Sequence, residues 1–216
     1  MSNRNFDKLF QPRSVALFGA TDRPGSVGAV VLRNLRRAGF KGELLLVNPH
    51  HRAIDGLPAY PHASGLPTIP ELAIIVTPPP TVPQLMAELG ALGTRAAVVI
   101  TAGFGELGEQ GRALQQAMLD AARPHLLRIV GPNCIGMLVP PIGLDASFSH
   151  LAPPPGGIAF VSQSGAMITA MLDWAAPRGI GARPASLARC RLPARHAGWM
   201  YLHQPHGRHA DEPALS

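Results

Sequence analysis

One loop of the sequence concentrates residues that could bind a phosphate group. An apolar run at positions 14–18 ends there, and glycines at positions 19, 25 and 28 precede a segment with helical spacing. At such a turn, free backbone N–H groups and the positive end of a helix dipole favour a bound anion. The residues expected to contact the ligand are Gly19, Ala20, Thr21, Asp22, Gly25, Ser26, Val27 and Gly28. The spacing matches neither GxGxxG nor a P-loop, and a plain glycine-rich turn without a ligand is the alternative.

The next apolar run, at positions 44–47, ends at Asn48 and Pro49 and is followed by His50, His51 and Arg52. An NAD-binding unit usually carries Asp or Glu at this point to accept the ribose hydroxyls. No carboxylate stands here. A polar and partly cationic cluster suits a ribose that bears a phosphate, as in NADP or coenzyme A, although solvated loop histidines are an equally good interpretation.

Three further apolar runs also end at small or ring-constrained residues. These residues are Thr77, Pro78 and Pro79, then Thr101, Ala102 and Gly103, and finally Gly131, Pro132 and Asn133. Because ligands of parallel α/β sheets bind outside the carboxyl ends of the strands, we expect all five loops to converge on one bound molecule. Cys134 has no nearby cationic or histidine partner in the sequence, so we expect a small buried thiol there and not a nucleophile.

The elements that must position these loops alternate between strands and helices. Apolar runs predict strands at 14–18, 44–47, 72–76, 96–100 and 127–130, and helical spacing predicts helices at 27–38, 82–92 and 110–122. Residues 49–70 form a connection rich in Pro, Gly and His. The pattern is typical of an α/β fold with a Rossmann-like, doubly wound parallel sheet.

A change in composition suggests where this first unit ends. We expect residues 1–137 to form the first domain and the Pro- and Gly-rich residues 138–157 to form a linker. Residues 158–181 then begin a second unit, with a strand at 158–161, the turn Ser162, Gln163, Ser164 and Gly165, and a helix at about 166–176. Residues 182–216 show neither a strand nor a helix period, and we expect a disordered tail or the product of a shifted reading frame.

Composition excludes several classes of protein. The chain holds 46% hydrophobic residues but no apolar stretch of about 18 residues, and its first eight residues lack the apolar run of a secretory signal. We therefore expect a cytoplasmic protein without a membrane partner. Half of the net charge of +6 falls in residues 182–216, which argues against a nucleic-acid partner for the rest. The two cysteines, Cys134 and Cys190, support neither a disulfide framework nor a metal site.

Six motifs in order, from the loop at 19–28 to Ser162-Gln163-Ser164-Gly165, resemble the CoA-binding domain of NDP-forming acyl-CoA synthetases, which are relatives of the succinyl-CoA synthetase α subunit. The resemblance covers residues 6–181 and extends to synthetase-like proteins fused to GNAT protein acetyltransferases. It implies coenzyme A, as acetyl-CoA or another acyl-CoA, as the cofactor. It also implies that the second unit is the start of a flavodoxin-like domain.

The resemblance assigns roles to the motifs. The loop at 19–28 would hold the phosphates of CoA, Asn48 and Pro49 would flank the adenosine, and Gly131, Pro132 and Asn133 would close the floor. The pantetheine channel would be lined by Thr77, Pro78, Pro79, Thr101, Ala102 and Gly103. Ser162, Gln163, Ser164 and Gly165 would form the helix N-terminus that receives a phosphorylated histidine, and two hydroxyls beside exposed N–H groups suit a phosphate dianion. An ordinary N-cap is the alternative.

The family's catalytic histidine, its acidic partner and its ATP-grasp module have no counterpart in this sequence, so we assign no catalytic residue. We expect a CoA-binding unit that does not complete the synthetase cycle alone and that needs phosphohistidine and ATP-grasp domains supplied in trans. Two alternatives stay open, an NADP-dependent oxidoreductase and a stand-alone CoA-binding regulator. Whether the chain is an enzyme by itself is left open.

Overall fold

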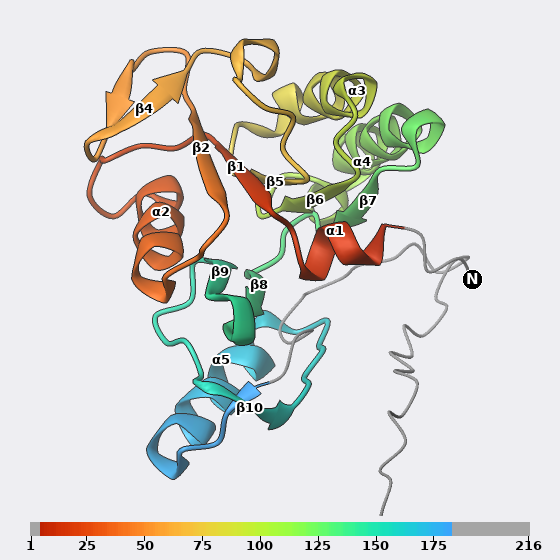
Figure 1. The fold of residues 1–216 in the computed structure, drawn as a ribbon. Coiled ribbons are helices and arrows are strands. Elements are labelled where there is room, and N and C mark those ends of the chain that lie inside the picture. The colour runs from red at the N-terminus through yellow and green to blue at the C-terminus, as the bar shows by residue number, and fades with distance from the viewer. Residues whose placement is uncertain (1–4, 183–216) are drawn as a thin grey trace, which may run out of the picture.

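A twisted sheet of seven strands runs through the computed structural model, which describes residues 5–182 (Figure 1). The strand order is β3-β4-β2-β1-β5-β6-β7, and every neighbouring pair is parallel except β3 and β4. The strands are β1 (Ser14–Phe18), β2 (Glu43–Val47), β3 (Ala53–Ile54), β4 (Leu57–Tyr60), β5 (Leu72–Ile75), β6 (Ala96–Val99) and β7 (Arg128–Val130). The Rossmann-like doubly wound fold expected from the sequence is confirmed.

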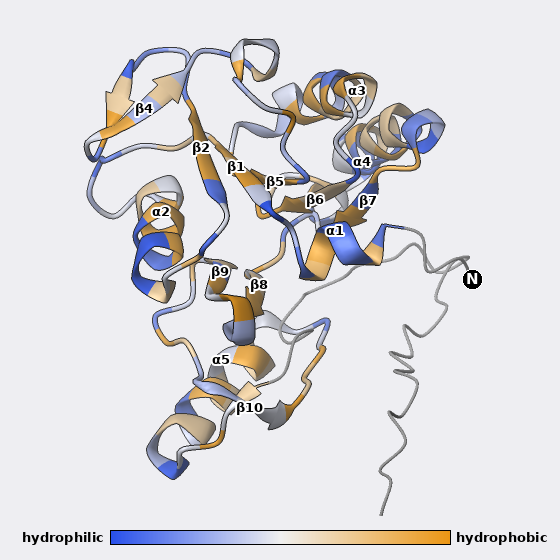
Figure 2. Cartoon of the chain, viewed as in Figure 1, coloured by the Kyte–Doolittle hydropathy of each residue, from blue (hydrophilic) through white to orange (hydrophobic). Residues whose placement is uncertain are grey.

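Helices cover both faces of this sheet. Helix α2 (Val27–Ala38) lies on one face, while α3 (Val82–Leu92) and α4 (Glu109–Ala122) lie on the other (Figure 1). Alternation along the strands supplies both interfaces, since Val15 and Leu17 of β1 pack toward α2 whereas Ala16 and Phe18 pack on the side of α3 and α4. A short helix, α1 (Phe6–Phe10), precedes β1. Figure 2 shows the hydrophobic central strands and the mixed surface of α2.

The expected helices begin and end close to the predicted positions because the sequence carries their caps. The Ser26 side chain accepts a hydrogen bond from the N–H of Ala29 at the start of α2, and Gly39 ends that helix in the left-handed conformation, with φ of 74°. Gly93 ends α3 in the same way, with φ of 112°. These local signals explain the agreement.

The connection at 49–70 contains a hairpin that the sequence interpretation did not include. Strands β3 and β4 are joined by Asp55 and Gly56, which have φ of 50° and 76°. Two residues with positive φ match the turn that an Asp-Gly pair favours in hairpins. The signal was therefore present in the sequence, but its two flanking strands are too short to show alternation.

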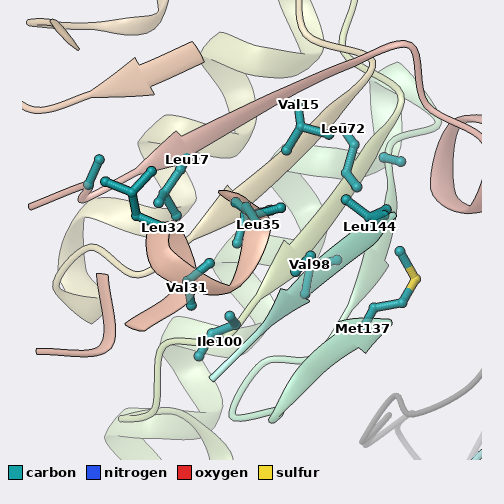
Figure 3. Packing of buried hydrophobic residues seen from close by; sticks show 14 of the residues in the cluster. Val15, Leu17, Val31, Leu32, Leu35, Leu72, Val98, Ile100, Met137 and Leu144 are labelled. Carbon is teal, nitrogen blue, oxygen red and sulfur yellow. The ribbon is translucent and has the colours of Figure 1, made fainter. Parts of the chain in front are cut away.

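The expected linker at 138–157 differs from the structure, because its first part is packed against the first domain. Strands β8 (Gly136–Val139) and β9 (Leu144–Ser147) form an antiparallel pair. Met137 and Leu144 of this pair belong to the same buried cluster as Val31 and Leu35 of α2, as Figure 3 shows. The turn between the strands, where Gly143 has φ of 66°, accounts for part of the proline and glycine content of this segment.

The second unit begins earlier than expected. Strand β10 spans Pro155–Ile158 and helix α5 spans Gly165–Ala175, so the strand expected at 158–161 is misplaced. Pro155 and Ile158 both form bridges to Ala182. Ile158 and Val161 are 51% and 47% exposed, so the apolar run at 158–161 is not a buried strand. The prediction for residues 182–216 falls, from residue 183 on, outside the described part of the chain.

Among residues 5–182, none of the helices combines the length and the apolar character needed to cross a lipid bilayer.

Candidate ligand-binding cleft

A cleft of about 580 Å³ opens at the carboxyl ends of β5 and β6. Its volume lies within the range of small-molecule sites. Eight of the residues singled out from the sequence line it, namely Val27, Thr77, Pro78, Pro79, Thr101, Ala102, Asn133 and Gly165. These residues come from α2, from three strand ends and from α5. Four of the five loops expected to converge thus contribute residues to the cleft, whereas Asn48 and Pro49 after β2 do not line it.

The loop at 19–28 is held tightly against the start of α2. The N–H of Gly19 donates to the carbonyl of Val47 at 3.0 Å, and a Cβ placed at Gly28 would overlap the carbonyl oxygen of Gly19. The Ser26 hydroxyl donates to the carbonyl of Arg23 at 2.7 Å. Because Val27 and Gly28 lie in the first helical turn, no carbonyl of the helix itself can pair with their N–H groups. Val27 lines the cleft, so the start of α2 is the part of this segment that lies beside it.

Asn48 supports this loop from the neighbouring strand. Its side-chain amide donates to the carbonyl of Ala20 at 2.8 Å, and its carbonyl oxygen accepts from the N–H of His50 at 2.8 Å. Both ends of the side chain are thereby engaged within the protein. Asn48 therefore acts on the loop geometry, while Pro49 and His50 are exposed beside it.

Hydroxyl groups hold the ends of β5 and β6 together. The Thr101 hydroxyl donates to the carbonyl of Thr77 at 2.8 Å, and the Thr81 hydroxyl donates to the carbonyl of Pro78 at 2.7 Å. Gly103, with φ of 107°, packs closely on the ring of Pro79, and its N–H donates to Glu106 at 2.6 Å. The Thr101 hydrogen bond therefore links the two segments, whereas the bonds of Thr81 and Gly103 each order one segment.

The segment after β7 contributes Asn133, Cys134 and Ile135 to the lining of the cleft. Gly131 has φ of 100°, and a Cβ there would overlap the carbonyl oxygen of Val99. Pro132 follows through a cis peptide bond, and the N–H of Asn133 donates to the carbonyl of Thr101 at 2.9 Å. Cys134 is 2% exposed, and its thiol lies 3.2 Å from the carbonyl oxygen of Val99. The expected buried thiol is confirmed.

The N-terminus of α5 reaches the same cleft. Gly165 and Thr169 line it, and the Ser164 hydroxyl caps the helix by accepting from the N–H of Met167 at 3.3 Å. The Ser162 hydroxyl accepts from the N–H of Ser164 at 3.0 Å, and Gln163 is exposed between them. Two helix N-termini, those of α2 and α5, therefore contribute to one cleft.

The lining carries no charge. Every residue that lines the cleft in the described part of the chain is apolar, a threonine, an asparagine or a cysteine. Within residues 5–182, no group of three or more His, Cys, Asp or Glu side chains is arranged to hold a metal ion. Such a lining can bind a ligand through main-chain groups and apolar contacts, and it offers no carboxylate or imidazole for acid–base chemistry.

Other lining residues were missed in the sequence interpretation. They are Val76, Ile100, Ile135, Phe148 and Thr169. Val76 and Ile100 are the last apolar residues of their runs, so their position was recoverable. Ile135 and Phe148 reach the cleft through the β8–β9 pair, which local sequence patterns did not predict.

Comparison with known proteins agrees with this geometry. Residues 13–140 match the family model described as CoA binding domain. The chain belongs to this family. Residues 155–186 of this CoA-binding protein match a second model, described as Succinyl-CoA ligase like flavodoxin domain. The resemblance inferred from the motifs is confirmed, and coenzyme A is supported as the bound species.

The relatives that this chain matches are longer proteins. The chain is 43% identical over 81% of its length to acetate–CoA ligase (ADP-forming) I of Archaeoglobus fulgidus, and 35% identical over 82% to the α subunit of the corresponding Pyrococcus furiosus ligase. The matches span only 25% and 39% of those proteins. An apo structure of acetyl-coenzyme A synthetase 1 from Ca. Korarchaeum cryptofilum aligns with a TM-score of 0.78 and 33% identity, over 86% of this chain and 40% of that one.

Proposed function

We propose that this chain is the CoA-binding part of an ADP-forming acyl-CoA synthetase-like protein. The observation that carries the proposal is an uncharged cleft of about 580 Å³ that joins the N-terminus of α2 to that of α5. Coenzyme A combines a phosphorylated end, which suits main-chain donors at a helix N-terminus, with a long uncharged arm, which suits a lining without ionisable groups.

The phosphates would lie at the loop of residues 19–28. The close approach of Gly28 to the Gly19 carbonyl supports this placement, because it leaves no side chain between the ligand and the helix start. Asn48 would help indirectly, by fixing the carbonyl of Ala20, while Pro49 and the exposed His50 would lie beside the adenosine. A bound CoA would supply the thiol that is acylated. The residues of this chain would orient it.

The pantetheine arm would run between the ends of β5 and β6. Thr77, Pro78 and Pro79 would form one wall, and Thr101, Ala102 and Gly103 would form the other. The hydrogen bonds between these segments support the assignment, since a preformed channel loses little entropy when a flexible ligand is bound. Gly131, Pro132 and Asn133 would close the floor.

The N-terminus of α5 would receive a phosphate group carried by another domain. Ser162, Gln163, Ser164 and Gly165 would surround it, and the position of Gly165 at the cleft supports transfer to a ligand bound there. The phosphohistidine and ATP-grasp domains that the complete cycle needs would belong to a longer chain or act in trans. An acetyltransferase partner domain and a cytoplasmic location remain parts of this proposal.

Titration calorimetry on the full 216-residue chain tests the proposal. We expect binding of CoA and much weaker binding of NADPH, because the chain matches the family model of a CoA binding domain. Binding of NADPH alone would overturn the assignment and favour the oxidoreductase.

A matched pair of variants locates the ligand. Ala102→Leu fills the cleft, whereas Ala91→Leu adds the same atoms to the exposed surface of α3. We expect at least a tenfold loss of CoA affinity for the first, equivalent to about 1.4 kcal/mol, and no change for the second. Equal affinities of the two variants would place CoA elsewhere.

A further inference from the structure

We propose that Phe148 and Ile135 form an apolar wall that contacts the acyl group of a bound acyl-CoA and limits its length. The proposal rests on the function proposed above and deepens it, because it names the residues of the same cleft that select the length of the acyl group joined to coenzyme A by a thioester. Nothing in the assigned motifs uses either residue.

Phe148 is held in an exposed position by its neighbours. Its side chain is 42% exposed and lines the cleft, while Ser147 and Ser149 on either side are 0% and 2% exposed. The Asn34 side chain donates to the carbonyl oxygens of both serines at 2.9 Å. Burial of an aromatic side chain is energetically favourable. A backbone that is anchored so that the Phe148 side chain stays exposed therefore indicates a surface that an apolar ligand covers.

Ile135 joins Phe148 to a firm support. The N–H of Phe148 donates to the carbonyl of Ile135 at 3.1 Å, and the Ile135 side chain packs in a buried cluster with Ile168 and Leu172 of α5. Both Ile135 and Phe148 line the cleft. The wall formed by Ile135 and Phe148 thus packs against α5, and we expect that a longer ligand does not displace it easily.

Thr169 adds to the apolar character of this wall. Its hydroxyl donates to the carbonyl of Gly165 at 3.1 Å, within helix α5. Since the hydroxyl is engaged there, the remaining methyl group is available to a ligand. The α5 side of the cleft is consequently lined by hydrocarbon from three segments that are separate in sequence.

The orientation of coenzyme A places the acyl group at this wall. Its phosphates and its thiol lie at opposite ends of the pantetheine arm. With the phosphates at the N-terminus of α2, an arm that crosses the cleft toward Gly165 and Thr169 of α5 would bring the thiol beside Ile135 and Phe148, which line the same cleft. A thioester-linked acyl group would then extend over Phe148.

Burial of one methylene group changes a binding constant by up to about fourfold, so a closed wall and an open one give measurably different preferences for acyl length. Calorimetric titration of the full chain with CoA, acetyl-CoA, butyryl-CoA and hexanoyl-CoA measures this preference. We expect the natural protein to bind acetyl-CoA at least as well as CoA and to bind hexanoyl-CoA more weakly.

Phe148→Ala opens the wall, and Trp174→Ala is the matched control, because Trp174 is an aromatic residue of α5 that is 49% exposed and does not line the cleft. We expect Phe148→Ala to raise the affinity for hexanoyl-CoA relative to acetyl-CoA at least threefold while CoA affinity changes less than twofold. Trp174→Ala is expected to keep the natural ratio.

Unchanged acyl preference in Phe148→Ala, with CoA still bound, would overturn the acyl wall and leave the proposed function intact. Failure of the natural protein to bind CoA would instead overturn the proposed function. If Phe148→Ala does not fold by circular dichroism, Phe148→Leu and Phe148→Trp replace it. These variants are expected to relax and tighten the length preference respectively, and the same ratio for both would refute the wall.

Discussion

The side-chain nitrogen of Asn34 lies 2.9 Å from the carbonyl oxygen of Ser147, 113 residues later in the chain. The same nitrogen donates to the carbonyl of Ser149 at 2.9 Å. Asn34 is 1% exposed, so both bonds are shielded from water. They tie α2, whose N-terminus forms one end of the cleft, to the segment that carries Phe148. One buried amide therefore links two parts of the cleft that are distant in sequence.

Removal of this amide should destabilise the protein. In Asn34→Ala, two buried carbonyl oxygens lose their donor, and we expect the free energy of unfolding to fall by about 2–4 kcal/mol. Urea denaturation measures the change. Gln116→Ala is the control, because Gln116 is an exposed side-chain amide on α4 that donates to Asp120 at 2.9 Å, and its loss should cost about 0.5 kcal/mol or less. Similar losses in the two variants would contradict the anchoring role.

Glu71, the residue before β5, is bonded to α1 and to the residue before β1, at the amino-terminal ends of these two strands. It accepts hydrogen bonds from Lys8 Nζ at 2.8 Å and from the backbone N–H of Arg13 at 2.8 Å. Burial raises the pKa of the carboxyl, but the hydrogen bonds from Lys8 and Arg13 outweigh burial and lower the pKa to about 2.

A carboxyl with a lowered pKa in the folded state stabilises the protein above its unfolded pKa and loses this contribution as the pH falls toward about 2. We expect Glu71→Gln to lower the free energy of unfolding by about 1–3 kcal/mol at pH 7. Between pH 4.5 and pH 2, the free energy of unfolding of the variant should fall much less than that of the natural protein. Urea titrations at several pH values measure both effects. An acid profile identical to that of the natural protein would contradict the assignment.

The sheet was predictable from the sequence because its signals are local. Apolar runs gave β1, β2, β5 and β6, and the glycines at 39 and 93 marked the ends of α2 and α3. The loops at the strand ends were predictable for a related reason, since parallel strands place their carboxyl ends at one edge.

The far side of the cleft was not predictable in this way. Phe148 enters through an antiparallel strand pair whose place against α2 depends on a tertiary contact, the bond from Asn34. In the sequence, Asn34 is one polar residue on an otherwise apolar helix surface. Residue spacing does not reveal which groups its side chain would bind. The role of Asn48 was also hidden, because a bond to the carbonyl of Ala20 leaves no trace in residue type or spacing.

Asp145 should make stability fall as the pH rises. Burial raises the pKa of this carboxyl to about 6, against the smaller lowering effects of Ser147 and of Arg37 on α2. Between the unfolded pKa and about 6, the folded state keeps a proton that the unfolded state releases, so the free energy of unfolding falls across this window by up to about 3 kcal/mol.

Asp145→Asn removes the titrating group. We expect it to raise the free energy of unfolding at pH 7 by about 1–3 kcal/mol and to leave it nearly unchanged at pH 4. Asp120→Asn, which alters an exposed carboxylate paired with Arg123, is the control and should change stability by about 0.5 kcal/mol or less. Thermal and urea unfolding at both pH values provide the measurement. Destabilisation of Asp145→Asn at pH 7 would show that the carboxylate makes a favourable contact there.

Gly28→Ala tests whether the close packing of the 19–28 loop is needed for the ligand. An added Cβ would overlap the carbonyl oxygen of Gly19 and would lie 3.2 Å from the side chain of Thr21, so the loop has to move away from the helix start. We expect CoA affinity to fall at least tenfold, equivalent to about 1.4 kcal/mol. The loss of stability is expected to be smaller than the overlap alone suggests, because alanine stabilises a helix by about 1 kcal/mol relative to glycine.

Gly157→Ala, where no atom lies within 4 Å of the added Cβ, is the matched control and should bind CoA normally. A folded Gly28→Ala variant with natural CoA affinity would mean that the phosphates are bound by another part of the chain.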